Sequence, residues 1–358
     1  MDTDPVQLLS LNSYDLLGQL KSKKTGGTDI TGATALQKID FTYNIRGWLK
    51  GINDIGGLNT GENDLFAFSI NYNDVPGNNV NDQVMPLFNG NIAETSWRSA
   101  TDNVLRRYGY RYDQLNRLLN AYYQKPGSAI SLTSSYDESA QYDKNGNITR
   151  MERSGEYDDE VYALAMDELE YFYDPVEKNR LLKVADHTNQ PAGFKDSPDN
   201  DTDDYTYDGY GNMTADRNKG ITSITYNHQN LPVEIVFGNL VNTKIRYLYE
   251  AAGKKVQKVV RQQVFDGSAI VTETTATDYL GGFHYAKGKL QHFPTAEGYV
   301  SVTYDKRNIS LRYFNYVYQY KDHLGNVRLS YGAKPGTQTP EIMEESHYYP
   351  FRDAAPQL

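Results

Sequence analysis

The chain has 358 residues, and its 46 acidic and 36 basic side chains give a formal charge of −10. No concentrated basic block is present to bind phosphates, which disfavours nucleic acid and anionic membrane surfaces as partners. Cysteine is absent, and this excludes disulfides, thiolate catalysis and cysteine zinc sites. No run of 18 apolar residues occurs, so we expect no helix that spans a membrane.

The aromatic content is unusual, because 31 tyrosines accompany only 12 phenylalanines and 2 tryptophans. Tyrosine combines a flat apolar ring with a hydroxyl group that needs water or a partner, and it is favoured in strands. A compact globule with one apolar core would use more Leu, Ile and Phe. The composition therefore indicates a sheet whose two faces are both only partly dry.

One short pattern, aromatic-x-Tyr-Asp-x-x-Gly-Asn-apolar, recurs along the chain from its beginning to its end. Its clear copies occupy residues 12–20, 41–49, 110–118, 141–148, 205–213 and 318–331, and weaker copies occupy 171–175, 225–231 and 247–256. The spacing drifts, since Tyr112 and Tyr142 are 30 residues apart whereas Tyr207 and Tyr226 are 19 apart. Repetition of this kind indicates a repeat architecture.

Each copy of the pattern predicts a β-hairpin. Its two aromatic residues at i and i+2 share one face, and the apolar residue after the turn returns to that face. The Asp or Asn is suited to accept hydrogen bonds from turn amides, and the Gly is suited to the left-handed conformation. A single β-sandwich rich in Tyr is the alternative, but it would not account for so many copies of one asymmetric pattern. We therefore predict an all-β array of stacked hairpins.

Helical signal is poor, and the spacing within 161–169 allows a turn or two of helix at most. Turn-forming residues place loops at 71–91, 190–204 and 332–340. None of these loops has the composition of a long disordered linker. We expect one continuous array without a domain boundary.

The most regular hairpin is 318–331. Its leading residues Tyr318 and Tyr320 project from one face, and alternating apolar residues follow the turn. The turn itself lies at 324–326, where Gly and Asn tolerate positive φ at low cost.

These motifs resemble a known family. Residues 205–214 look like a YD repeat, residues 320–328 closely resemble the core motif of rearrangement-hotspot (RHS) proteins, and residues 347–351 resemble the segment that follows that core. The similarity covers nearly the whole chain, and its composition looks like that of versions from Bacteroidota. The residues that carry it, which we expect to be structural, are Tyr207, Asp208, Gly211, Asn212, Tyr320, Asp322, His323, Leu324, Gly325, Asn326, Arg328, Tyr349, Pro350 and Phe351.

The resemblance implies a hollow β-cage in which YD-repeat strands form a spiral sheet. Residues 1–317 would be the shell region, and residues 318–358 would be the RHS-associated core hairpin and C-terminal segment of the same β architecture. In the family, the cage encloses a variable C-terminal polypeptide, often a toxin used against competitors or hosts. The implied partners are a C-terminal toxin cargo in a longer chain, an immunity protein and secretion machinery, and the implied location is secreted or at the cell surface.

The chain departs from the family pattern in two respects, the cleavage segment and the length. Many members carry paired Asp-Pro-x-Gly segments after the core that cut the cargo free, but here Asp174-Pro175 is followed by Val-Glu, and Arg352 replaces a family Gly. We therefore do not expect this chain to cleave itself as those family members do. The chain stops seven residues past Phe351, without room for a cargo domain. We also expect about nine hairpins to be too few to close a cage, which would leave unpaired strand edges.

The N-terminus lacks the basic and apolar regions of a signal peptide, so we expect another export route or a longer chain.

No enzyme signature is evident, and we predict no catalytic residue, cofactor or metal. His323 beside Asp322 allows a general base with an orienting carboxylate, but a His that hydrogen-bonds its own hairpin is the preferred interpretation. Residues 199–204 resemble the start of a calcium loop, yet Asp204 and Tyr210 stand where Gly and Glu are required, which favours a solvated acidic loop. Residues 158–160 are more simply a charged turn than a glycosidase pair.

The sequence therefore predicts a structural shell segment of an RHS/YD-repeat toxin that encapsulates a C-terminal cargo. The alternative is a cell-surface adhesion or carbohydrate-binding β module, because exposed Tyr rings can stack on sugars or pair with partner strands.

Overall fold

The computed structural model describes residues 6–76, 83–129, 131–155, 158, 163–198, 202–238, 243–307 and 312–350. All regular structure in these ranges is β, and it comprises 25 strands. The predicted all-β class is confirmed. Among the described segments there is no helix that is long and apolar enough to cross a membrane.

The strands form two sheets, and within each sheet every strand pairs with the next one in the chain. This is the order that an array of antiparallel hairpins requires. The first sheet contains β1 (Leu11–Tyr14), β2 (Leu20–Thr25), β3 (Gln37–Tyr43), β4 (Leu49–Ile52), β5 (Phe66–Asn71), β6 (Glu94–Ser99), β7 (Arg106–Tyr112), β8 (Leu118–Gln124), β9 (Glu138–Tyr142), β10 (Ile148–Gly155), β11 (Leu164–Tyr173) and β12 (Leu181–Asp186). The second sheet contains β13 (Tyr205–Tyr207), β14 (Met213–Asp216), β15 (Ile221–Tyr226), β16 (Pro232–Phe237), β17 (Lys244–Tyr249), β18 (Lys255–Phe265), β19 (Ile270–Leu280), β20 (Phe283–Ala286), β21 (Lys289–Thr295), β22 (Gly298–Tyr304), β23 (Arg312–Lys321), β24 (Val327–Ala333) and β25 (Pro340–Glu345).

The hydrogen-bonded ladder is interrupted between β12 and β13, although side chains from both sheets share one small core that contains Leu169, Val184 and Tyr205. The division expected at residues 317 and 318 falls inside strand β23. The turn or two of helix that the spacing at 161–169 allows is absent from its described part, because residues 164–173 form β11.

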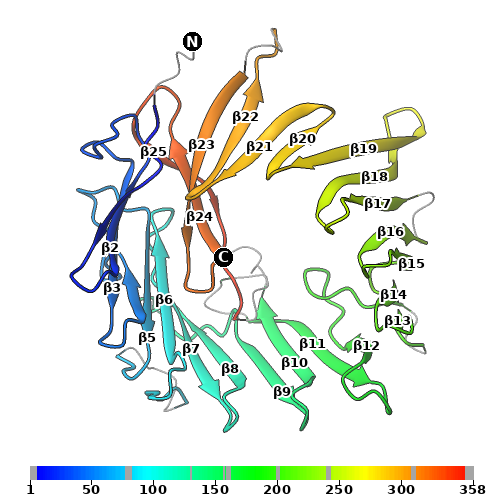
Figure 1. Ribbon diagram of the computed structural model, residues 1–358. Helices are drawn as coiled ribbons and strands as arrows, with labels where there is room; N and C mark the ends of the chain where they lie inside the picture. The colour runs from blue at the N-terminus through cyan, green and yellow to red at the C-terminus, as the bar shows by residue number, and fades with distance from the viewer. Residues whose placement is uncertain are drawn as a thin grey trace.

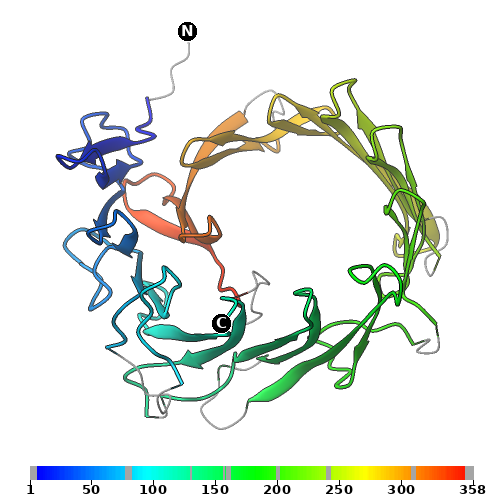
Figure 2. The same ribbon diagram turned by 60° about the horizontal axis from the view of Figure 1, so that its bottom comes forward.

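The strands follow a ring whose two ends overlap (Figures 1 and 2). Figure 2 shows strands β23 to β25 on the inner side of the N-terminal strands. The side chains between these two layers form the main core, in which the ring of Tyr320 lies 5.6 Å from that of Phe66. Tyr318 Oη donates a hydrogen bond of 2.9 Å to the carbonyl of Leu8. The C-terminal hairpin is therefore an inner layer against the start of the chain.

Packing between layers, and not strand pairing, brings the ends of the array together. Among the described strands, β1 and β25 stand at the ends of the strand order, as the prediction of unpaired edges requires. The two sheets do not close by strand pairing, as the expectation from about nine hairpins has it, but that expectation did not include the overlap of the two ends. Apolar faces at the two ends bury one another without strand pairing between them.

The opposite side of the ring is a single layer. Strands β15 to β21 contain no buried residue among their described positions, so both faces of this part of the sheet contact solvent. The composition, with its many Tyr and few Phe, predicts such a partly dry sheet.

Tyrosine hydroxyl groups connect each hairpin to the one before it. Ten of them donate a hydrogen bond to a backbone carbonyl at or near the start of the preceding return strand, which shows why these positions carry Tyr and not Phe. The donors and acceptors are Tyr43 to Leu20, Tyr72 to Leu49, Tyr112 to Ile92, Tyr142 to Leu118, Tyr173 to Ile148, Tyr207 to Leu181, Tyr226 to Met213, Tyr249 to Pro232, Tyr304 to Leu290 and Tyr348 to Val327. We call these bonds tyrosine staples.

Candidate functional site

The turn of the core hairpin is held by Asp322. Its Oδ1 accepts hydrogen bonds from the amides of Leu324 at 2.9 Å and Asn326 at 3.0 Å, and Gly325 takes the left-handed conformation with φ of 83°. This is the role that the repeat pattern predicts for its Asp and Gly. Leu324 at the tip is 43% exposed.

The YD hairpin at 205–216 has the same turn. Asp208 accepts hydrogen bonds of 2.9 Å from the amides of Tyr210 and Asn212, and Gly211 has a φ of 85°. The side-chain hydrogen bond from Asn212 lowers the pKa of Asp208, and the turn amides act in the same direction. This turn joins β13 and β14, which stand at the far end of the second sheet's strand order from the core hairpin β23–β24, so these motif residues stabilise their own repeat.

Arg328 is the central cation of the core hairpin. It is 5% exposed, and its guanidinium group lies 4.8 Å from the ring centre of Trp97 in β6. Its Nε donates to the carbonyl of Ser346 at 3.2 Å, and its Nη1 lies 3.8 Å from Asp322 Oδ2. Burial lowers the pKa of Arg328, and the Asp322 carboxylate opposes that change. Arg328 thus joins the hairpin, the outer layer and the C-terminal segment in one cluster.

His323 stacks on Phe68 of β5, with the ring centres 5.7 Å apart and the planes inclined by 18°. The Asp322 carboxylate accepts hydrogen bonds from the turn amides and faces Arg328, so its contacts hold the turn in place. This arrangement differs from that of a base and its orienting carboxylate, because His323 projects onto the facing layer.

His347 is fixed by two partners at the C-terminal end of the described chain. Trp97 Nε1 donates to His347 Nδ1 at 2.8 Å, and His347 Nε2 lies 3.1 Å from Glu345. Indole N–H only donates, so Nδ1 must accept and the proton of the neutral ring resides on Nε2. Burial lowers the pKa of His347, and the hydrogen bond to Glu345 only partly offsets this. Burial also opposes the charged form of Glu345, but hydrogen bonds from His347, Ser99 and Thr101 prevail and lower its pKa to about 2.

The next residues lie along the inner layer. Tyr348 forms the last tyrosine staple, and Tyr349 Oη donates to the carbonyl of Ser154 at 2.6 Å. Tyr349 also packs 5.8 Å from Tyr136, and Arg153 stands over its ring. The structure therefore brings the 347–350 segment and the core hairpin to one place, as their shared resemblance suggests. Phe351 and Arg352 lie outside the described residues.

A pocket of about 220 Å³ lies between the core hairpin tip and the wall. Aromatic rings dominate its lining, and its polar groups include Asp322, His323, Asn326 and Arg328. Nothing in the sequence signals this pocket or the contact of Arg328 with Trp97, because both join residues more than two hundred positions apart.

The described residues of the remaining candidate sites form contacts within the protein. Asp158 forms an ion pair of 3.3 Å with Lys125, while Asp159 and Glu160 lie outside the described residues. Asp204 accepts the amide of Val184 at 2.9 Å, and the first two acids of the calcium-like loop, Asp199 and Asp201, are not described. No group of three His, Asp or Glu side chains suited to a metal ion exists in the described ranges.

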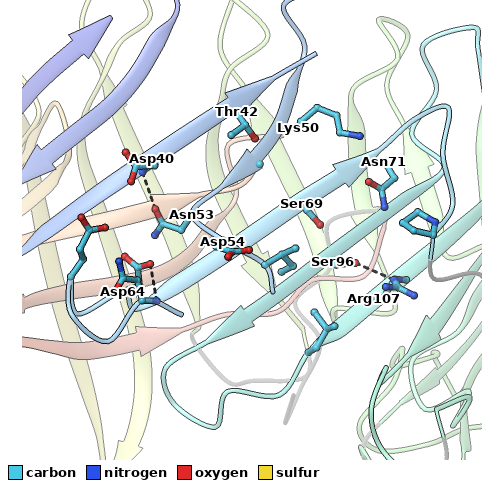
Figure 3. Close-up of a pocket in the computed structure, with 16 residues that line it drawn as sticks. Asp40, Thr42, Lys50, Asn53, Asp54, Asp64, Ser69, Asn71, Ser96 and Arg107 are labelled. Atoms are coloured by element: carbon cyan, nitrogen blue, oxygen red, sulfur yellow. Dashed lines mark hydrogen bonds between the residues drawn. The ribbon is translucent and has the colours of Figure 1, made fainter. Parts of the chain in front are cut away.

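A larger pocket, of about 570 Å³, lies on the opposite, outward face of strands β3 to β7 (Figure 3). Ser96 and Arg107 line this pocket, while their strand neighbours Thr95, Trp97 and Tyr108 line the inner one. The alternation of side chains along a strand thus separates the two pockets. Sequence reasoning did not predict the outer pocket.

Comparison with known proteins gives little further identification. No protein-family model matches the chain, and no curated protein matches it. Among solved structures, the chain is similar to one titled "Crystal Structure of TcdB2-TccC3", with a TM-score of 0.49 and 12% sequence identity. The match covers 97% of this chain and 18% of that chain, so this chain spans less than a fifth of that neighbour.

Proposed function

We propose that this chain is a wall segment of a protein shell that surrounds a polypeptide cargo. The observation that carries the proposal is the single-layered arc, in which strands β15 to β21 have no buried residue among the described positions. Most sheets of this width bury one face against another layer. A wall between solvent and a cargo needs two partly polar faces, and tyrosine staples stabilise such a sheet without a second layer.

The position of the C-terminal segment supports the same proposal. Tyr349 packs in the inner aromatic cluster, and Figure 2 shows the described chain after β25 running toward the inside of the ring. A polypeptide that continued from Pro350 in this direction would begin on the inner side of the wall. This is where an enclosed cargo would have to start.

The motif resemblance extends the proposal to an RHS/YD-repeat polymorphic toxin that is secreted or displayed on the cell surface. The cargo would be a toxin used in interbacterial competition, with an immunity protein and secretion machinery as further partners. We propose a structural and not a catalytic role for the shell, because Asp322 and Asp208 serve as turn caps. A glycan-binding role has less support, since ten Tyr hydroxyl groups are used within the wall.

The proposal can be tested by fusing one small folded reporter domain either after Leu358 or before Met1. Small-angle scattering then compares the two fusions, which have the same mass and the same linker. We expect the C-terminal fusion to have the smaller radius of gyration, because its reporter starts inside the ring. Equal radii, with both reporters equally open to protease, would contradict a container role.

A further inference from the structure

The outer pocket has a built floor. One row of side chains crosses five neighbouring strands at the same level, because strand pairing aligns Thr42 with Gly51, Gly51 with Ser69, Ser69 with Ser96 and Ser96 with Arg107. Three of these positions are Gly or Ser. A Cβ atom at Gly51 would lie 2.9 Å from the Thr42 hydroxyl oxygen, so a larger residue at this position would crowd the floor of the pocket.

The two ends of the pocket differ in charge. Figure 3 shows Asp40, Asn53, Asp54 and Asp64 at one end and Lys50, Asn71 and Arg107 at the other. The cations at the second end already have partners, since Lys50 pairs with Asp74 at 3.2 Å and Arg107 donates to Ser96 at 3.1 Å. At the acidic end, Lys38 already donates to Asp40 at 2.9 Å and to Glu62 at 3.0 Å, which leaves Asp54 and Asp64 without an ion pair among the described residues.

At the acidic end, one oxygen of the Asp64 carboxylate lacks a hydrogen-bond donor in the described part of the chain. Asp64 is 7% exposed, and its Oδ2 accepts the amide of Asn59 at 3.2 Å. Its buried Oδ1 has no hydrogen-bond partner. An unpaired carboxylate oxygen in such a site is costly unless a donor satisfies it. A ligand that places a positive charge beside the Asp64 carboxylate would offset that cost.

The apolar part of the lining restricts the ligand further. Ile55, Pro76 and Leu105 line the pocket beside the polar groups. Methylene groups pack well on such surfaces while a charged end reaches a polar partner. The combination of an apolar wall, a low floor and an acceptor-rich end fits a short alkyl chain with a terminal ammonium group.

We propose that the outer pocket binds an alkylammonium group, from a lysine side chain of a partner protein or from a small polyamine, with the nitrogen against Asp54 and Asp64. The proposal is independent of what the shell encloses. It places a ligand site on the outward face, away from the core hairpin.

The pH dependence of ligand affinity gives a second measurement. Burial raises the pKa of Asp64, the neighbouring Glu62 and Asp40 raise it further, and Lys38 and the Asn59 amide lower it. A bound ammonium group favours the charged carboxylate, so binding releases a proton from Asp64 wherever the free site still holds one. The affinity should therefore rise with pH through the raised pKa of Asp64, and Asp64→Asn should remove this dependence.

Isothermal titration of the full chain tests the proposal with three probes. Nα-acetyl-lysine methylamide represents the lysine side chain, putrescine represents the polyamine, and Nα-acetyl-norleucine methylamide is the uncharged control. We expect one or both ammonium probes to bind and the norleucine probe not to bind. Which of the two binds more tightly distinguishes the partner-protein source from the free polyamine.

Matched variants locate the site. Asp64→Asn should weaken ammonium binding by about tenfold or more, because a hydrogen bond to a charged group is lost. Asp54→Asn, in an exposed loop, should also weaken it, whereas Glu341→Gln on distant β25 changes the net charge equally and should have no effect. Absence of binding at millimolar probe concentration would overturn the proposal. So would equal weakening by Glu341→Gln, since this would indicate only non-specific attraction to an acidic protein.

Discussion

The double-layered and single-layered sides of the ring are built from the same hairpin but differ in what covers it. In the double-layered side, β5 places Phe66, Phe68 and Ile70 in the core beneath β23 and β24. In the single-layered side, β18 and β19 are rich in Lys, Gln and Thr and have no buried residue. Both sides carry tyrosine staples, such as those of Tyr112 and Tyr249. The repeat motif therefore specifies the wall, while the residues between the motifs decide whether a second layer can dock on it.

The largest difference is expected from removing one aromatic ring on each side. Phe66→Ala should destabilise the protein by about 3–5 kcal/mol, because Phe66 is 1% exposed between two layers. Phe237→Ala in half-buried β16 should cost only about 1–2 kcal/mol, since fewer contacts are lost. Urea unfolding measures both changes. Equal costs would mean that the layers do not form a common core.

Acid should weaken the double-layered side selectively through His347. Its folded-state pKa lies below the ordinary 6.5, so the unfolded chain binds a proton first as the pH falls below that value. The associated stability is fully present above pH 6.5 and is lost as the pH falls toward the folded-state pKa, by up to about 1.4 kcal/mol per pH unit. Gln can accept from Trp97 and donate to Glu345, so His347→Gln should remove this part of the slope. Parallel stability curves for the two proteins between pH 7 and 5 would disprove the role of His347.

The tyrosine staples should contribute equally on both sides. Tyr112→Phe and Tyr249→Phe each remove one hydroxyl group and keep the ring, so each should cost about 0.5–1.5 kcal/mol. Thermal unfolding of the two variants measures the costs. A loss confined to Tyr112→Phe would show that the staple is important only under a second layer.

The smallest effect is expected at a single repeat turn. Asp208→Ala removes two hydrogen bonds to turn amides in β13–β14 and should lower the unfolding temperature by less than either staple variant does, because the loss is confined to one turn. Amide exchange should accelerate in residues 205–216 and remain unchanged in β5. A global acceleration would mean that one turn supports the whole array.

Local features of the fold were predictable from the sequence. The alternation around Tyr318 and Tyr320 predicts the strand, and Asp322 and Gly325 predict the turn that the structure contains. Such features depend on residues close together in the chain, where φ preferences and side-chain period act directly.

Contacts between distant segments were not predictable. The pairs Trp97 with His347 and Thr25 with Tyr331 join the two ends of the chain, and no local propensity encodes them. The floor of the outer pocket depends on the register of five strands, which sequence spacing does not determine when loops vary in length. For the same reason the overlap of the two ends of the array was not predicted.

Native-state hydrogen exchange in low concentrations of denaturant tests the overlap of the two ends most directly. If β24 is an inner layer on β5, amides of residues 66–70 and 327–333 should open together, with the same free energy. Those of β18 and β19 should open at lower free energy. The account would be contradicted if residues 327–333 exchanged independently of residues 66–70 and as readily as the single-layered strands.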